Sequence, residues 1–311
     1  MRKYLLLPVL AFAACDYAAV ESADTETTQV SLQQRSEQAS QISAPLAIEH
    51  EYLARLLQIS PDIYSGAQPK TDDAFRSLKE LGIKTIVSVD AARPNEEAAL
   101  AEGMRYIHIP IGYDAIPEAA SLAYAQLMRE VELPVFIHCH HGRQRGPAAS
   151  AIALRASTGC SSEAALAVLH AAGTSKKYEG LWRDVEAWTP SALDAEPVVL
   201  SALHELPAFT VKMAGIDRTW DTIKQLREED WESVSLVPQT QLLLQQLQDC
   251  AGLNPAEHIE DQELHRGLDD VVSFAERMQV AAEALDKDLL EESYRDLRAS
   301  CNDCHADYRN H

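Results

Sequence analysis

The chain has little positive charge. Its 27 Lys and Arg residues are outnumbered by 48 Asp and Glu residues, which gives a formal net charge of −21 at pH 7 and a sequence pI of about 4.8. Such a surface repels polyanions, which excludes nucleic acids and anionic lipid surfaces as partners of the folded part. An anionic substrate therefore needs a site with local positive charge.

The chain also lacks an apolar segment of the roughly 20 residues that span a bilayer. Its longest apolar run, LLLPVLAFAA at residues 5–14, follows Arg2 and Lys3 and precedes Cys15. This order is typical of an export signal over residues 1–15. The sequence FAAC resembles a bacterial lipoprotein cleavage site, which implies lipidation of Cys15; an ordinary signal peptide cut nearby is the alternative. Both kinds of signal place the protein outside the cytoplasm. The lipoprotein signal implies a location on the periplasmic side of a bacterial membrane, with the lipid anchor as the protein's only contact with that membrane.

Two breaks divide the rest of the chain. Residues 16–47 are polar and lack apolar periodicity, so they are predicted to form a flexible tether. The stretch TPSALDAEP at 189–197 is rich in proline and small residues, which indicates a second break. With 46% hydrophobic residues in 311, the chain can build two cores, which we expect in residues 48–190 and 191–311.

The two predicted domains differ in fold class. The first alternates strand and helix patterns, which predicts an α/β domain with a mainly parallel sheet. Its expected strands are 63–69, 84–90, 105–111 and 134–139, and its expected helices are 72–82, 96–103, 118–131, 146–158, 161–172 and 177–188. The second shows no strand pattern but four stretches with apolar residues at helical spacing, at 207–226, 238–250, 260–285 and 287–309. These predict an all-α antiparallel four-helix bundle.

The segment HCHHGRQRG, residues 138–146, connects a predicted strand to a predicted helix. Backbone N–H groups and the helix dipole attract anions at such a junction. The same potential favours the thiolate form of Cys139, which is the nucleophilic form. Arg145 follows six residues later and supplies a planar fork of donors that suits an oxyanion. We therefore predict a site that binds an oxyanion beside a nucleophilic cysteine.

HCHHGRQRG resembles the Cys-x5-Arg loop of protein tyrosine and dual-specificity phosphatases, and residues 48–190 are similar to the compact dual-specificity branch. The resemblance implies that Cys139 attacks phosphorus to form a phosphocysteine and that Arg145 holds the equatorial oxygens. It implies a phosphomonoester or other small oxyanion as substrate. Asp114, in IGYDAIP, matches the acid that protonates the leaving oxygen and later activates water, and Asp90 is a second candidate. The remaining residues of the implied phosphate-binding loop are His140, His141, Gly142, Arg143, Gln144 and Gly146.

Gly146 departs from the family pattern, which usually has Ser or Thr after the arginine to help the cysteine leave. Hydrolysis of the phosphoenzyme is then slow, or the loop traps oxyanions, or Cys139 handles sulfur as a persulfide. The neighbouring His138, His140 and His141 suggest a metal cluster. The preferred interpretation is that His138 orients the loop and the other two histidines line its rim.

The motif CNDCH at 301–305 implies a different chemistry. Cys301, Cys304 and His305 lie at positions i, i+3 and i+4, and hence on one face of one helical turn. Both thiols can bond the vinyl groups of a haem while His305 binds the iron. A zinc site needs four ligands and the sequence has no second CxxC, while a redox dithiol typically follows a strand. We predict a covalent haem c and no other metal.

SCNDCHADYR, at the end of the four-helix pattern, resembles cytochrome c′ over about residues 197–311. The resemblance implies a haem in the bundle with His305 as the proximal ligand, and homodimer formation through the bundle. Met213, on the first bundle helix, is a candidate distal ligand; packing in the apolar core is the preferred alternative.

Together these motifs predict a periplasmic cysteine-dependent phosphatase linked to a haem domain that senses redox state or a gas ligand, with a redox partner protein. The alternative is an electron-transfer or gas-binding cytochrome. In that case the phosphatase-like domain binds anions without hydrolysis or handles sulfur.

Overall fold

The computed structural model describes residues 44–189, 198–253 and 262–309. The described residues belong to one compact unit. The predicted export signal, Cys15 and most of the predicted tether lie outside the described residues. Among the described helices, none is both long and apolar enough to cross a membrane.

A six-stranded sheet, in the order β1-β2-β3-β6-β4-β5, forms the centre of the first part of the fold. Its parallel strands are β3 (Ile63–Ala67), β6 (Val135–Cys139), β4 (Thr85–Ser88) and β5 (Arg105–His108). Two antiparallel strands extend one edge, β1 (Leu46–Ile48) and β2 (Leu56–Ser60). The mainly parallel sheet is confirmed, whereas β1 and β2 were not predicted.

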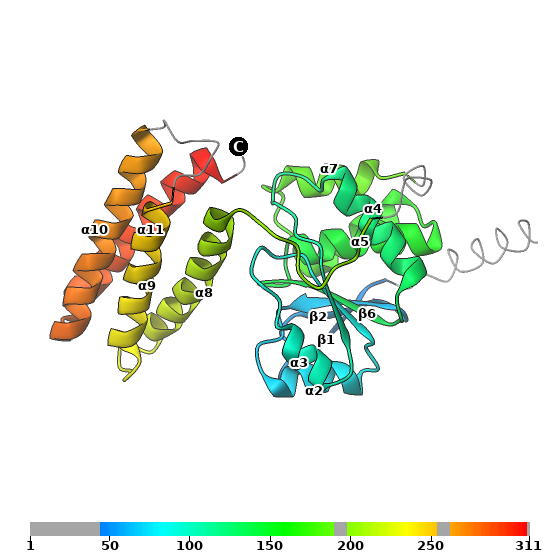
Figure 1. The fold of residues 1–311 in the computed structure, drawn as a ribbon, viewed down its shortest axis with the longest axis horizontal. Coiled ribbons are helices and arrows are strands. Elements are labelled where there is room, and N and C mark those ends of the chain that lie inside the picture. The colour runs from blue at the N-terminus through cyan, green and yellow to red at the C-terminus, as the bar shows by residue number, and fades with distance from the viewer. Residues whose placement is uncertain (1–43, 190–197, 254–261, 310–311) are drawn as a thin grey trace, which may run out of the picture. The chain divides into compact units, whose positions relative to one another are not determined.

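Helices cover both faces of this sheet (Figure 1). On one face lie α2 (Asp72–Glu80) and α3 (Glu96–Ala101), whose side chains share a core with β4, β5 and β6. On the other lie α4 (Glu118–Glu130), α5 (Arg145–Thr158) and α7 (Glu179–Ala187), with α6 (Ser162–Ala172) between the last two in sequence. Side-chain oxygens of Thr71, Asn95 and Ser161 accept from backbone N–H groups and so cap the N-termini of α2, α3 and α6.

The topology brings one helix N-terminus to the centre of the sheet. All of β6 is buried and ends at Cys139, and α5 begins at Arg145. The first ten residues of α5, Arg145–Leu154, are all buried, so this helix is enclosed by the domain. The carboxyl ends of the parallel strands and the N-terminus of α5 therefore meet around residues 139–145, the usual place for ligands in open α/β sheets.

An extended segment after the predicted domain break still contacts the α/β domain. The carbonyl of Ser201 accepts from the backbone N–H of His108 at 2.9 Å, and the N–H of His204 donates to Nδ1 of His108 at 3.1 Å. The backbone of Val198 exchanges two hydrogen bonds with the side chain of Gln126, at 2.6 and 2.9 Å. These bonds hold the segment against β5 and α4.

The last four helices form an antiparallel bundle, as predicted. They are α8 (Ala208–Glu228), α9 (Leu236–Ala251), α10 (Gln262–Ala284) and α11 (Lys287–Tyr308). Trp220 of α8 stacks on Tyr294 of α11 with ring centroids 4.8 Å apart, and Arg227 binds Glu291 at 2.7 Å. These contacts join the first and last helices around a common apolar core.

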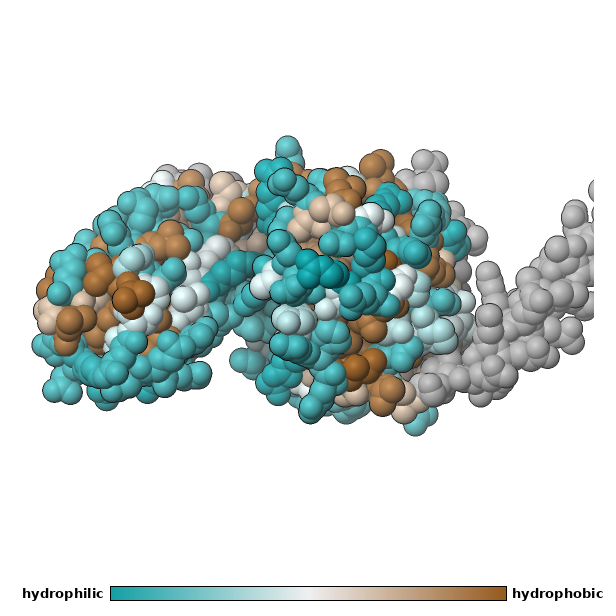
Figure 2. Space-filling view, turned by 90° about the horizontal axis from the view of Figure 1, so that it is seen from below, coloured by the Kyte–Doolittle hydropathy of each residue, from teal (hydrophilic) through white to brown (hydrophobic). Residues whose placement is uncertain are grey.

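The exposed surface agrees with the acidic composition. The face drawn in Figure 2 is mostly hydrophilic, with apolar side chains in small groups. Exposed large apolar residues such as Val199, Val234 and Leu285 are scattered along the sequence. Scattered exposed apolar residues are ordinary on folded proteins and need no separate explanation.

Replacing Tyr294 with alanine should destabilise the bundle. The side chain is 3% exposed and contacts both Trp220 and Trp231, so its removal leaves a cavity. We expect a loss of about 3–5 kcal/mol in the free energy of unfolding. Urea denaturation followed by tryptophan fluorescence measures it, with the exposed Val234→Ala as the control. An equal effect of the two changes would contradict this packing.

Candidate active site

The loop after β6 is shaped by a glycine that no other residue replaces easily. Gly142 has a φ of 64°, and a Cβ at this position would lie 2.3 Å from the backbone of Gly66 and Ala67 at the end of β3. The N–H of Gln68 also donates to the carbonyl of His140 at 3.2 Å. The loop is therefore pressed against the end of β3, and only a residue without a side chain permits this approach.

Cys139 and Arg145 lie at the two ends of this loop, as the motif predicts. Cys139 is a free thiol with 3% of its surface exposed. Arg145 is 5% exposed. The pKa of the Arg145 guanidinium is raised, and Cys139 is close enough to contribute to that rise. Burial opposes that shift, and the carboxylate of Asp90 is the main group that outweighs it. A cation and a nucleophile are thus held together at the start of α5.

The guanidinium of Arg145 is only partly engaged. Its Nη2 donates to Oδ1 of Asp90 at 2.8 Å, and its Nη1 donates to the carbonyl of Ile111 at 3.4 Å. Its Nε is buried and has no hydrogen-bond partner within the described part of the chain. A buried donor without a partner is costly, so this N–H is suited to an oxyanion held beside Cys139.

Asp90, at the end of β4, is the counterion of this site. Its two carboxylate oxygens bind different arginines. Oδ1 binds the guanidinium of Arg145, and Oδ2 binds the guanidinium of Arg218 on α8. Burial favours the neutral form, but the two guanidinium groups outweigh it and hold the pKa of Asp90 well below its usual range. Asp90 therefore stays ionised and has no proton to give. Its geometry suits a residue that positions Arg145 and does not suit a general acid.

Asp114 lies on the loop between β5 and α4, beside the ring that contacts Arg145. The preceding Tyr113 lies 4.2 Å from the guanidinium carbon of Arg145, measured to the ring centroid. Gly180 of α7 packs directly against the backbone of Asp114, because a Cβ there would lie 1.3 Å from its carbonyl oxygen. The side chain of Asp114 is itself exposed. The loop backbone is thus fixed near Arg145, and Oδ1 of the exposed Asp114 lies beside the backbone of Gly112.

The three histidines around Cys139 divide into two roles. His138 is buried beneath the loop, and its Nε2 lies 2.5 Å from the hydroxyl of Tyr106. Burial lowers the pKa of His138 to about 4, so its ring is neutral. Nε2 of His140 and Nε2 of His141 lie 2.8 and 2.9 Å from Oδ2 of Asp221 on α8.

The other loop residues anchor the loop from outside. Nε of Arg143 donates to the carbonyl of Gly173 at 2.9 Å, and the side-chain oxygen of Gln144 accepts from the N–H of Ser175 at 2.9 Å. Both partners follow α6. The side chains of Arg143 and Gln144 are therefore occupied, which leaves the backbone N–H groups and Arg145 as the groups available to an anion.

Gly146 follows Arg145 in the first turn of α5 and has no hydroxyl. A Cβ at Gly146 would be 3.1 Å from the backbone nitrogen of Cys139, so a larger residue would require a small shift of the helix or loop. The next hydroxyl along α5, that of Ser150, donates to the carbonyl of Gly146 at 2.9 Å. It already stabilises the first turn of the helix.

The residues of the CNDCH motif fit a covalently bound haem. Cys301, Cys304 and His305 lie on α11, and all three are half-buried. Both thiols are free, as attachment to a porphyrin requires. Cys301 packs against the bundle core, as do Phe209 and Met213 of α8, so the motif faces apolar side chains. In this structure Met213 packs against the core, the role preferred from the sequence.

Four residues of this region carried no sequence signal, namely Tyr113, Asp217, Arg218 and Asp221. Three of them are charged residues on α8, and Asp221 lies 81 positions from His140. Charged residues on a helix are usually solvated, so nothing in the sequence assigns them to the loop. Their place beside the loop is seen only from the packing of α8.

Asp90→Asn should destabilise the protein in a pH-dependent way. It leaves Arg145 and Arg218 without their shared carboxylate, and breaking a buried pair costs about 3–5 kcal/mol. The folded-state pKa of Asp90 lies below the unfolded value of about 3.9, so this stabilisation is complete above pH 4 and is lost as the pH falls further. The difference in unfolding free energy between wild type and variant should be equal at pH 7 and pH 5 and shrink below about pH 4.

Urea denaturation at each pH measures this difference. Glu102→Gln removes an exposed pair with Lys79, 2.9 Å long, and should cost less than about 1 kcal/mol. If the difference in unfolding free energy between wild type and Asp90→Asn grew as the pH fell, the assigned charge of Asp90 would be contradicted.

One part of the chain matches a known family. Residues 62–158 match the family model described as polymorphic toxin system, DSP-PTPase phosphatase. A beta-lactamase hydrolase-like protein of Agrobacterium fabrum is 36% identical over an alignment of 100 residues that covers 28% of this chain and 22% of that protein. The chain thus spans about a fifth of the length of this curated relative.

Two crystal structures of TpbA from P. aeruginosa are also similar. The complex with pTyr has 22% sequence identity and a TM-score of 0.41, covering 48% of this chain and 92% of TpbA. The second has 24% identity and the same TM-score of 0.41, covering 48% of this chain and 94% of TpbA.

The matched family segment runs from the start of β3 to the end of α5 and includes Cys139 and Arg145. Residues 62–158 therefore form a domain of the cysteine-based dual-specificity and protein tyrosine phosphatase type.

Proposed function

We propose that this chain is a periplasmic phosphomonoesterase that works through a phosphocysteine, joined to a helical bundle that binds haem c. One observation carries the proposal. Arg145 is buried and charged beside Cys139, and its Nε has no hydrogen-bond partner in the described residues. Such a donor is suited to an oxyanion positioned for attack by the thiolate.

In the first step, Sγ of Cys139 attacks phosphorus, and an S–P bond forms as the bond to the ester oxygen breaks. Asp114 gives its proton to the departing oxygen, which leaves as an alcohol or phenol. Arg145 and the backbone N–H groups of the loop hold the three non-bridging oxygens. The ion pair with Asp90 keeps the guanidinium of Arg145 in place.

In the second step, water attacks the phosphocysteine and gives a proton to Asp114. The S–P bond breaks, which releases inorganic phosphate and returns Cys139 to the thiolate. Gly146 has no hydroxyl to stabilise the departing sulfur. The second step is therefore slower than the first, and the phosphoenzyme accumulates.

In the bundle, Cys301 and Cys304 would hold the haem and His305 its iron, and Met213 of α8 would contribute to the apolar surroundings of the bundle core. Bound haem would supply an iron that exchanges electrons with a partner protein or binds a gas. Arg218 of α8 contacts Asp90, the counterion of Arg145. In this proposal, a movement of Arg218 with the bundle would alter the ion pair that positions Arg145.

A second function is favoured by Gly146. Without the hydroxyl that assists release of the thiolate, the loop is suited to hold an oxyanion without turning it over. The protein would then be an electron-transfer or gas-binding cytochrome with an anion-binding domain.

Phosphate release distinguishes the two functions. The exported, haem-loaded protein should hydrolyse phosphotyrosine, the compound crystallised with TpbA, and p-nitrophenyl phosphate. Cys139→Ser should abolish release, and Asp114→Asn should slow it about 10²–10⁴-fold. The loss in Asp114→Asn should be smaller with p-nitrophenyl phosphate, because its leaving group needs less protonation.

Asp73→Asn changes an exposed carboxylate on α2 and is the matched control, which should keep the wild-type rate. Binding of phosphate or vanadate without any turnover by wild type would favour the second function. Release by Cys139→Ser would exclude the phosphocysteine.

The haem is tested separately. Full-length protein exported by cells that mature cytochromes c should carry haem that stays attached on denaturation, detected by the pyridine haemochrome spectrum. The double variant Cys301→Ala, Cys304→Ala should lose it, whereas Cys250→Ala, which changes a buried free thiol of α9, should retain it. Attached haem in the double variant would contradict the assignment.

A further inference from the structure

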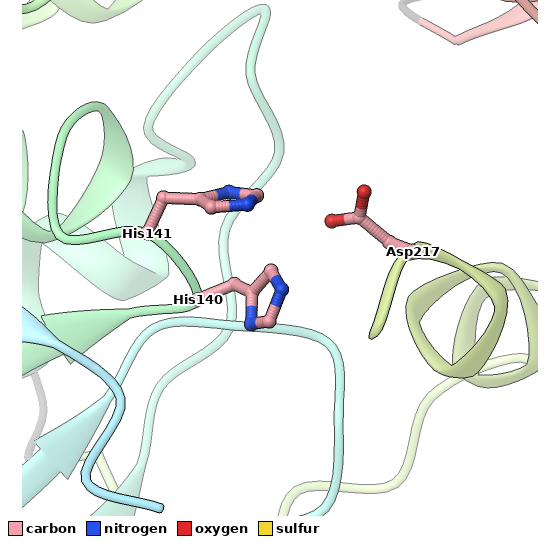
Figure 3. A group of neighbouring side chains, drawn as sticks. All are labelled: His140, His141 and Asp217. Atoms are coloured by element: carbon pink, nitrogen blue, oxygen red, sulfur yellow. The ribbon is translucent and has the colours of Figure 1, made fainter. Parts of the chain in front are cut away.

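A cluster of metal-binding side chains lies next to the phosphatase loop. His140, His141 and Asp217 each offer one ligand atom, and these atoms lie within 4.8 Å of one another (Figure 3). Two of the residues follow Cys139 directly, and the third lies on α8. The cluster contains no cysteine, so it is chemically distinct from both the Cys139 site and the CNDCH motif.

The side chains converge on one place. Figure 3 shows the imidazoles of His140 and His141 one above the other, with the carboxylate of Asp217 facing them. Asp221 lies one helical turn after Asp217 and holds both imidazoles. Its Oδ2 is shared by Nε2 of His140 at 2.8 Å and Nε2 of His141 at 2.9 Å. Two imidazoles and the carboxylate of Asp217 therefore lie around one place, and Asp221 orients the imidazoles.

Asp221 fixes the orientation of the two imidazoles. Lys224 binds the other oxygen, Oδ1, at 2.7 Å, which leaves Oδ2 turned toward the histidines. His140 is buried, so its ring is held in a fixed position.

The distances suit a small divalent ion. Nitrogen and oxygen ligands lie about 2.0–2.1 Å from Zn²⁺, so two ligands of a tetrahedral site are about 3.4 Å apart. The donor atoms of this cluster reach 4.8 Å, and rotation of the half-exposed Asp217 and the exposed His141 side chains closes that gap. The mixture of imidazole and carboxylate ligands suits Zn²⁺ better than Mg²⁺ or Ca²⁺, which prefer oxygen alone.

We propose that His140, His141 and Asp217 bind a divalent transition metal ion, best matched by Zn²⁺, while Asp221 orients the two imidazoles. The ion ties the loop after Cys139 to α8. From the sequence we expected no metal besides haem iron, and we preferred a role for His140 and His141 in lining the rim of the loop. The site requires neither turnover of a phosphate ester nor a bound haem, so it stands apart from the proposed function.

The test uses the full-length, haem-loaded protein in phosphate-free buffer, so that the thiols of CNDCH are already bonded. Zn²⁺ is titrated by calorimetry, and the bound ion is examined by X-ray absorption at the zinc edge, where iron does not interfere. We expect one Zn²⁺ per chain with nitrogen and oxygen ligands, outer-shell scattering from imidazole, and no sulfur.

Asp217→Ala and His141→Ala should each weaken Zn²⁺ binding about 100-fold or more, since even changes behind the ligands cost 10–100-fold. The matched control is Asp249→Ala, which removes a carboxylate of α9 paired with Lys212 and should leave the affinity unchanged. Far-ultraviolet circular dichroism and the haem spectrum show that each variant is folded.

Three results would overturn the proposal. Sulfur scattering would place the zinc on Cys139 or on the CNDCH thiols. An unchanged affinity in Asp217→Ala and His141→Ala would place it elsewhere on the acidic surface. Absence of binding by the wild-type protein would reduce the group to a hydrogen-bonded contact between the loop and α8.

Discussion

The site depends on the buried ion pair between Arg145 and Asp90. A guanidinium without a counterion is too costly to bury at the start of α5, and a carboxylate at the end of β4 is equally costly alone. Each makes the other possible, and the second arginine on Asp90, Arg218, explains why the carboxylate stays ionised despite its burial. The parallel pairing of β4 with β6 brings the two residues together, because both strands end at the same edge of the sheet.

The loop between Cys139 and Arg145 has its shape because small residues let backbones approach. Gly142 lies against the end of β3, and Gly146 lies against the backbone of Cys139. The first contact forms the anion-binding loop. The second leaves the first turn of α5 without a side chain beside Cys139. Small residues at these two positions therefore let the loop and the helix approach their neighbours closely.

Much of this architecture follows from local sequence patterns. Strands β3 to β6 are apolar runs bounded by turns, and the bundle helices repeat apolar residues at helical spacing, so both were predictable. Strand β1 has only three residues, two of them exposed, and β2 gains its identity only by pairing between β1 and β3. Neither has a local signal strong enough to predict.

The site could be predicted only where its residues are close in sequence. Cys139 and Arg145 share one loop, and their spacing carries the chemistry. The role of Asp90 depends on Arg218, which lies 128 positions away, and the surroundings of His140 and His141 depend on α8. These contacts arise from packing between distant elements, which no local pattern records. Asp90, the second candidate acid, is for this reason better explained as the counterion of Arg145.

The most direct test of the account is to trap the covalent intermediate. Full-length protein is mixed with phosphotyrosine, quenched in the first turnovers, digested and examined by mass spectrometry. The account predicts one phosphoryl group on the peptide that contains Cys139, at high occupancy because Gly146 leaves the second step slow. Phosphate release with no phosphoryl group on Cys139, or with the group on His140 or His141, would contradict it.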